Sequence, residues 1–238
     1  MHSEQFGNLV NYDYGAFAIP FQEDMSFGLS VMRLGVDGIP DTRNALYDAN
    51  GDGIIDINDD RLDYSRITEF SNQDWAFYLT FAKRQTEDFY WGINAKIIRR
   101  DLAEYGATGI GFDVGAYYTP MENLFLGANL QDATTTLVAW STGRNELVSP
   151  TLKIGGAYKF AEFLGGYIMP ALDFDIRFEN RQFASNFNLG PVSFDMHAGI
   201  EYTFKNLIYV RGGHNHGKKF TFCADVKMPN LTLYYFFA

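Results

Sequence analysis

Apolar and polar residues alternate one by one along most of the chain, which is the period of a β-strand and not of a helix. In residues 172–179, for example, Leu, Phe, Ile and Phe alternate with Asp, Asp, Arg and Glu. We therefore predict an all-β protein of about twelve strands, many near the ~10 residues that cross a bilayer when tilted. The predicted strands lie near residues 10–18, 25–31, 75–82, 89–97, 108–118, 124–131, 152–158, 172–179, 194–202, 208–212, 220–226 and 231–237.

The direction in which the apolar side of these strands points decides between two kinds of protein. In a soluble β-sandwich or lipocalin-like barrel the apolar side packs inward, whereas in an outer-membrane barrel it meets lipid and the polar side is enclosed. The polar sides here combine glycine with charges of both signs, which suits a crowded or wet lumen. The apolar sides end repeatedly in an aromatic residue, as in the girdle at a membrane interface.

We therefore predict a transmembrane antiparallel up-and-down β-barrel. The predicted membrane-interface aromatic residues are Trp91, Tyr118, Tyr158 and Tyr202, and the predicted polar lumen residues are Asp113, Asp173, Asp175, Arg177, Glu179, Asp195, His197 and Glu201.

Composition narrows the classes of protein further. Aromatic residues make up 17% of the chain, which favours long strands and an interface that accepts amphipathic rings. No stretch approaches the ~18 apolar residues of a helical span, so a membrane protein of this composition must cross with strands. The net charge of −10 argues against nucleic acid as a partner, and the single cysteine excludes an internal disulfide framework.

Connections alternate between short and long, which predicts the orientation of the strands. Residues 84–88, 119–123, 204–206 and 228–230 form short connections, whereas residues 35–74, 99–107, 131–150 and 181–191 form long ones. Outer-membrane barrels have short periplasmic turns and long external loops, which places the 35–74 connection outside. With about twelve strands, both ends of the chain then lie on the external side. We expect residues 1–238 to be one barrel domain lacking a terminal strand at each end, because one more strand at each end gives ~14 and returns both termini to the periplasm.

The start of the chain also bears on this expectation. Residues 1–5 show none of the basic and apolar regions of a secretory signal, which a barrel needs to leave the cytoplasm. We therefore expect the chain to be processed or its first part to be missing.

The longest connection contains an acidic segment with the spacing of a calcium loop, at residues 48–59. Oxygen ligands converge on the hard cation, and a glycine occupies the position of the sharp turn, here Gly53. The last position holds Asp where the EF-hand loop has Glu, as in dockerin-type repeats. The alternative is a solvated turn rich in Asp, Asn and Gly. The predicted ligands of a structural calcium ion are Asp48, Asn50, Asp52, Ile54 through its carbonyl, Asp56 and Asp59.

The sequence contains no motif of a known catalytic centre. A nucleophile elbow, a phosphate loop, a dinucleotide fingerprint and a zincin motif are all missing. The charges of residues 173–179 share one strand face, which favours a ladder of paired charges over an acid/base pair. His197 is expected to form hydrogen bonds on the same polar face. We therefore do not expect an enzyme.

Five segments follow one another in a recognisable order. They are residues 95–102 (AKIIRRDL), 109–120 (GIGFDVGAYYTP), 126–135 (LGANLQDATT), 149–155 (SPTLKIG) and 172–181 (LDFDIRFENR). In this order they resemble the PorV/PorQ-like family of outer-membrane proteins, over a stretch from about Phe6 to the C-terminus. The resemblance implies a FadL-like barrel of fourteen strands in the outer membrane of a diderm bacterium. The chain departs from the family in lacking an N-terminal strand or plug and a final strand, and in carrying the calcium-type insertion.

The resemblance also implies a function. Better-known relatives serve type IX secretion, in which a PorV-like protein carries secreted cargo to a surface attachment complex. Cargo or secretion components are then expected at the external loops, where Leu137, Val138 and Trp140 are apolar. Two alternatives stay open. One is a FadL-like passive transporter with an apolar pocket near Tyr78, Tyr117 and Phe125, and the other is a soluble calcium-binding β-barrel protein.

Overall fold

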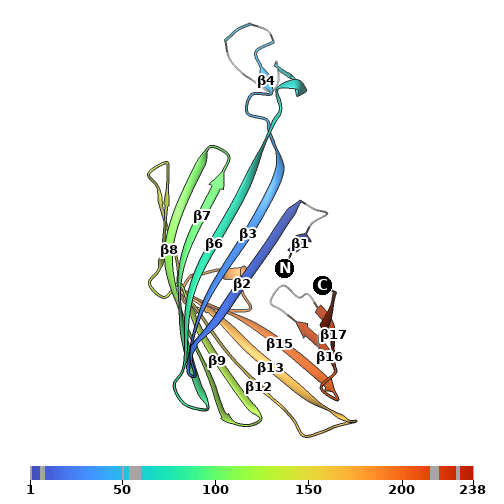
Figure 1. Cartoon of the computed structure of the whole chain (residues 1–238). Helices are drawn as coiled ribbons and strands as arrows, with labels where there is room; N and C mark the ends of the chain where they lie inside the picture. Colours follow the sequence, from blue (N-terminus) through green and yellow to red (C-terminus); the bar gives the residue numbers. More distant parts are fainter. Residues whose placement is uncertain are drawn as a thin grey trace.

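The computed structural model describes residues 2–5, 9–49, 51–53, 60–214, 220–228 and 231–237 as one long, curved antiparallel sheet with a projecting hairpin (Figure 1). The all-β class and the antiparallel arrangement are confirmed. Among the described residues, no helix is long and apolar enough to cross a membrane. The elements are β1 (His2–Gln5), β2 (Val10–Gln22), β3 (Met25–Asp41), β4 (Leu46–Tyr47), β5 (Arg61–Leu62), η1 (Tyr64–Arg66), β6 (Thr68–Arg84), β7 (Phe89–Leu102), β8 (Tyr105–Met121), β9 (Leu124–Gln131), β10 (Thr136–Trp140), β11 (Asn145–Val148), β12 (Thr151–Tyr158), β13 (Gly166–Arg177), η2 (Gln182–Ala184), β14 (Phe187–Leu189), β15 (Val192–Phe204), β16 (Ile208–His214), β17 (Phe220–Met228) and β18 (Leu231–Phe237).

Eleven of the twelve predicted segments lie within strands, and the twelfth, residues 172–179, runs two residues past the end of β13. Neighbouring predicted strands pair with one another. The sheet runs β1-β2-β3-β6-β7-β8-β9-β12-β13-β15-β16-β17-β18. Between β9 and β12 the chain forms the hairpin β10–β11, which continues the sheet along the far half of β8, with Leu137 opposite Ile110. This meander is the connectivity expected of an up-and-down barrel.

The sheet does not close in the part of the chain that the structure describes. The pairing order begins at β1 and ends at β18, and β1 covers β2 only from Val10 to Asp13. The predicted closed barrel is thus not formed by these strands alone. A free strand edge leaves backbone N–H and C=O groups without partners, a costly state in lipid.

The strands extend further into the predicted 35–74 loop than the sequence indicated. β3 and β6 stay paired as far as Asp41 and Thr68, with an irregularity between Val36 and Ile39. Gly38 lies within this irregularity and has a φ of +68°, which glycine adopts without strain. The result is a hairpin that stands well clear of the rest of the molecule (Figure 1).

The two faces of the sheet differ in chemistry, and the polar face is the buried one. On β8, Phe112 and Val114 are 41% and 42% exposed, whereas Asp113 between them is only 5% exposed. Side chains on the concave side of a curved sheet crowd one another, so the polar face is the concave face. Among the described residues, the buried apolar side chains are only Ala45, Ala76, Ala107 and Val138. The molecule therefore has almost no apolar core.

Candidate functional site

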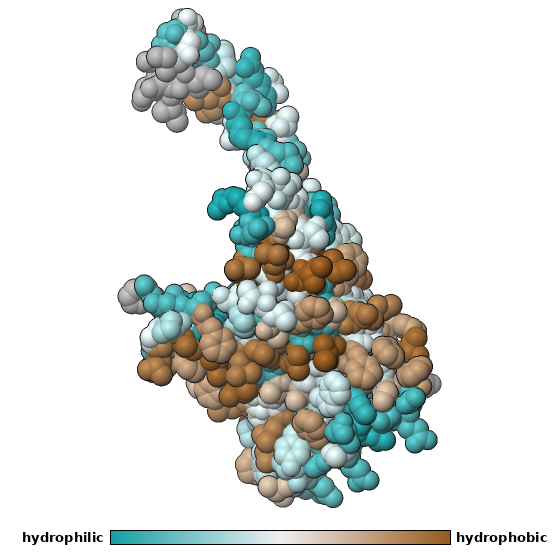
Figure 2. All heavy atoms as spheres, turned by 90° about the vertical axis from the view of Figure 1, so that its left-hand side faces the viewer, coloured by the Kyte–Doolittle hydropathy of each residue, from teal (hydrophilic) through white to brown (hydrophobic). Residues whose placement is uncertain are grey.

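The apolar face is continuous across the sheet. Strand register places Phe27, Phe81, Ile93 and Val114 in one row across β3, β6, β7 and β8. Figure 2 shows the apolar side chains gathered in a band on one side of the molecule, with hydrophilic residues on the projecting hairpin above it. On β8 the band runs from Ile110 to Tyr118, about 27 Å at ~3.4 Å per residue. At a strand tilt of ~40° this is about 20 Å high, close to the ~25 Å of outer-membrane barrels.

Aromatic rings border the band at the end of the short turns. The rings of Phe27 and Phe81 lie 5.3 Å apart, and those of Phe81 and Trp91 lie 5.7 Å apart. The Tyr118 ring contacts Phe89 at 6.2 Å, and the Tyr158 ring contacts Phe160 at 5.0 Å. The fourth predicted interface residue, Tyr202, donates a hydrogen bond to the Leu164 carbonyl at 3.0 Å. All four predicted aromatic residues thus lie at the same end of the sheet.

The concave face holds a first cluster of charges where β9 passes into β10. Lys96 Nζ lies 2.7 Å from Asp113 Oδ1 and 2.6 Å from Asp132 Oδ1, and Thr136 donates to the same Asp132 oxygen. Asp132 reaches this position because residues 132–135 form a turn between β9 and β10, with φ of +53° at Asp132. A Cβ on Gly111 would collide with Thr136 and Lys96, so only glycine fits there.

A second cluster crosses β12, β13 and β15. Lys153 Nζ lies 3.1 Å from Asp175 Oδ2, and register places Asp175 directly opposite Asp195. Arg177 lies between them, 3.8 Å from Asp175 and 3.9 Å from Asp195. Arg181 also pairs with Asp195, from the segment that links β13 to β14. Two like charges directly opposite each other are destabilising, and these cations offset the repulsion between Asp175 and Asp195.

A third cluster lies on β15, β16 and β17. Arg211 Nε contacts Glu201 Oε2 at 2.5 Å, and its guanidinium also pairs with Asp225, which is 2% exposed. Each of these buried carboxylates therefore has a cationic partner. The partners Lys96, Lys153, Arg181 and Arg211 and the carboxylates Asp132 and Asp225 were not among the predicted site residues.

The remaining predicted lumen residues have different surroundings. Asp173 is exposed and lies opposite His197, and Glu179 lies beyond the end of β13 and is exposed. Ligand atoms of Asp173, Asp175 and His197 come within 4.8 Å of one another. Since Asp175 already pairs with Lys153, this grouping is explained by charge pairing.

The acidic segment of the hairpin is described only in part. Asp48 and Asp52 are among the described residues, whereas Asn50, Ile54, Asp56 and Asp59 lie outside them. The Asp48 carboxylate accepts hydrogen bonds from the backbone N–H groups of Gly51 and Gly53, the latter at 2.8 Å. Both glycines have positive φ, +78° and +80°. The backbone at Gly51 and Gly53 is therefore turned toward the Asp48 carboxylate.

An ion-pair cluster ties the base of the hairpin to the β7–β8 turn. Arg43 binds Asp41 and, with Nη1 at 2.6 Å, Glu104 Oε1. Hydrogen bonds from Arg43 lower the pKa of Asp41 to about 2 and hold the pKa of Glu104 below its usual value. The same contacts raise the pKa of Arg43.

No protein-family model and no curated protein matches this chain. The geometry therefore carries the functional argument: an exposed apolar band, an enclosed set of paired charges and an acidic hairpin at one end.

Proposed function

We propose that the chain is an outer-membrane β-barrel protein of a diderm bacterium, in which the apolar band contacts lipid. The observation that carries this proposal is the inverted exposure on β8, where Phe112 faces out and Asp113 is buried. A soluble sandwich or lipocalin-like barrel requires the reverse. The free edges of β2 and β18 leave backbone N–H and C=O groups without partners, which is costly in lipid. We therefore propose that further strands pair with these edges and complete a barrel of about fourteen strands.

Within this setting we propose a PorV-like role in protein secretion or surface assembly, with a secreted cargo protein or a secretion component bound at the external loops. Two features support it. The projecting hairpin exposes Leu62 and Tyr64, at 54% and 76%. Residues 35–74 also contain ten acidic and three basic residues, a formal charge of −7 out of the total of −10. The proposed partner surface is thus acidic with a few large apolar side chains.

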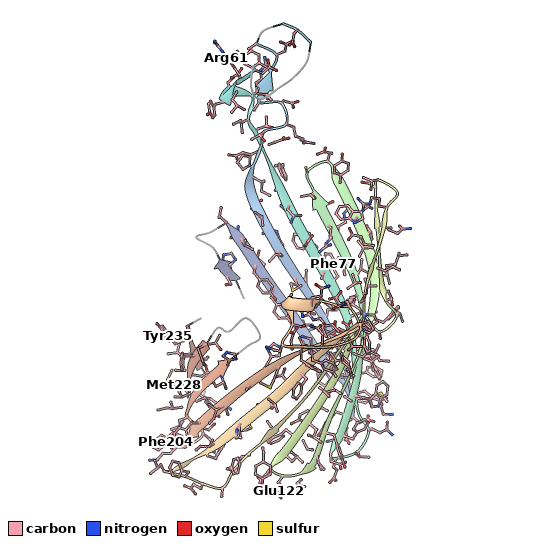
Figure 3. All side chains as sticks on the ribbon, turned by 180° about the vertical axis from the view of Figure 1, so that it is seen from behind. Arg61, Phe77, Glu122, Phe204, Met228 and Tyr235 are labelled. Atoms are coloured by element: carbon pink, nitrogen blue, oxygen red, sulfur yellow. The ribbon has the colours of Figure 1, made fainter. Side chains whose placement is uncertain are left out.

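Cysteine labelling of the full-length protein tests the membrane assignment. Arg61→Cys and Glu122→Cys lie at opposite ends of the molecule (Figure 3) and are placed in a Cys223→Ser background. A maleimide that cannot cross membranes should label R61C in intact cells and E122C only after lysis. Equal labelling of both positions in intact cells, or recovery of the protein without membranes, contradicts the proposal.

A photo-crosslinking amino acid then tests the partner proposal. Placed at Tyr64, it should trap a secreted protein or secretion component, and placed at Glu122 it should not. Correct membrane insertion without any adduct at Tyr64 would reject the secretion role alone.

The FadL-like transporter remains a second candidate because of one observation. The rings of Tyr117 and Phe125 stack at 6.5 Å beside a hollow of about 460 Å³ that also includes Gly127 and Gly155. This apolar hollow is of a size that binds small molecules. Phe125→Ala with unchanged uptake of hydrophobic compounds would remove the reason for this candidate.

We further propose that the acidic segment binds a structural calcium ion. The position of Asp48 supports this proposal, because its carboxylate is directed into the turn. The first residue of a calcium loop must place its ligand oxygen there.

A further inference from the structure

The apolar face carries a hollow of about 700 Å³ between two rows of side chains. Phe17, Leu29 and Leu79 form one wall, and Phe77, Ile97 and Ile110 form the other. Register confirms that each wall is a true row across neighbouring strands, two residues apart along each strand. A hollow of this volume accommodates a ligand chain and not only water.

Small residues create the space. Gly15 stands in the row of Phe77, and Ala95 stands in the row of Leu79. A Cβ on Gly15 would meet only Val31 Cγ1, at 3.7 Å, so the backbone has room for a side chain that the sequence does not supply.

The next outward-facing row, toward the hairpin, is charged. Asp13, Arg33, Trp75 and Arg99 are directly opposite one another on β2, β3, β6 and β7. The Arg33 guanidinium carbon lies 5.7 Å from the centre of the Trp75 ring. The Trp75 ring also stacks on Phe77, at 6.1 Å. The hollow therefore ends, on the external side, at an aromatic ring flanked by two arginines.

Both arginines retain donors for a ligand. Arg33 contacts Asp13 at 3.1 Å and lies 4.0 Å from Asp37, and Arg99 contacts Asp101 at 2.5 Å and donates to the Thr108 hydroxyl at 3.3 Å. Each guanidinium has five N–H donors, so both keep donors beyond these contacts. Guanidinium groups bind phosphate in bidentate geometry. The carboxylates of Asp13 and Asp101 and the Thr108 hydroxyl beside Arg99 can accept hydrogen bonds from sugar hydroxyls.

We propose that this surface binds one phosphorylated, acylated sugar lipid of the outer leaflet. An acyl chain occupies the hollow, a phosphate binds Arg33 and Arg99, and the sugar lies against Trp75. The proposal rests on the proposed function, because it requires the apolar face to contact lipid. It goes further in naming one lipid class and one site on that face.

Native mass spectrometry of the full-length protein, extracted from outer membranes in mild detergent, tests the proposal. The wild-type protein should retain one glycolipid. Arg33→Gln with Arg99→Gln should reduce the retained fraction at least about tenfold, because both charge-assisted contacts to the phosphate are lost. Arg144→Gln, at the exposed β10–β11 turn, removes an arginine outside the site and should retain the lipid.

A second variant tests the hollow without changing charge. Gly15→Leu should fill it and release the lipid, whereas Ala128→Leu, elsewhere on the apolar face, should not. Equal retention in all variants, or equal retention of ordinary phospholipid, overturns the site. Membrane fractionation of each variant separates this outcome from failure of the proposed function, in which the protein would not be found in the membrane at all.

Discussion

For single residues, side-chain volume and charge together determine which side chains pack on the concave face. Gly111 leaves the space that Lys96 and Thr136 fill, and Lys96 in turn neutralises Asp113 and Asp132. Loss of a partner from a buried ion pair costs more than the pair itself contributes, because a charge is left without compensation. The cluster is therefore sensitive to substitution at each of its members.

Gly111→Ala is expected to destabilise the protein by about 1–3 kcal/mol, the usual cost of overpacking. The new Cβ must displace Thr136 and Lys96. Thermal unfolding in detergent measures the effect. Gly127→Ala is the control, since its Cβ would meet no atom within 4 Å. Equal melting temperatures for the two variants would contradict the argument.

Lys96→Met is expected to cost about 3–5 kcal/mol, because it leaves two buried carboxylates unpaired. Adding Asp113→Asn and Asp132→Asn removes those charges and should recover much of the stability in the same unfolding assay. A triple variant no more stable than K96M would show that charge is not the cause.

The Asp48 carboxylate is expected to be essential for calcium binding. Titration calorimetry on the full-length protein should give a dissociation constant of about 10⁻⁴–10⁻³ M, as for extracellular modules. Asp48→Asn should abolish the binding, and Glu69→Gln on the same hairpin should leave it unchanged. Wild-type protein that binds no calcium would identify the segment as a solvated turn.

At the scale of elements, alternation predicted which side of each strand is buried, but not where the strands depart from regular pairing. Asp113, Asp175 and Asp195 lie on the predicted face because parity along a regular strand is fixed. Asp132 joins them only through the turn at residues 132–135 between β9 and β10, which alternation does not predict. The strands of the projecting hairpin were also missed beyond Gly35 and before Asp74, because glycine, proline and aspartate there suggested a loop.

The link at the base of the hairpin should respond to pH only in strong acid. The tether itself is the pair of Arg43 with Glu104, whose pKa is held below its usual 4.5 by the Arg43 hydrogen bonds, while Asp41, with its pKa lowered from 3.8 to about 2, holds Arg43 in place. Both interactions are complete above about pH 5 and are lost as the pH falls toward 2. A nitroxide at Thr42→Cys, in the Cys223→Ser background, should report a restrained hairpin base at about pH 5 and a mobile one near pH 2. Arg43→Gln should be mobile at pH 7. A transition at pH 5–6 would exclude this ion pair as the tether.

At the scale of the whole molecule, the sequence predicted the twelve strands from β2 to β18 on the main path of the sheet and the inverted faces. It did not predict β1, the β10–β11 hairpin or β14, nor how the edges are satisfied. Alternation specifies which side of each strand faces out, whereas closure of the sheet depends on partners for β2 and β18 that the described strands do not provide.

Substitutions on the apolar face test whether that face contacts lipid. Phe112→Lys, within the apolar band, should weaken membrane insertion by about 2–4 kcal/mol, and Met121→Lys, on the same face at the end of β8, by about 0–1 kcal/mol. Equal insertion of both variants, measured by refolding into vesicles, would argue against the proposed lipid contact.

The unequal distribution of charge along the molecule has a consequence for how copies share a surface. With −7 of the −10 charges on residues 35–74, neighbouring molecules would present like-charged tips to one another. Their mutual repulsion acts over a Debye length of about 8 Å at physiological ionic strength and weakens as salt is added. Low salt should therefore keep the molecules apart in the membrane plane. Divalent cations should neutralise the acidic hairpins of residues 35–74 and allow the molecules to cluster.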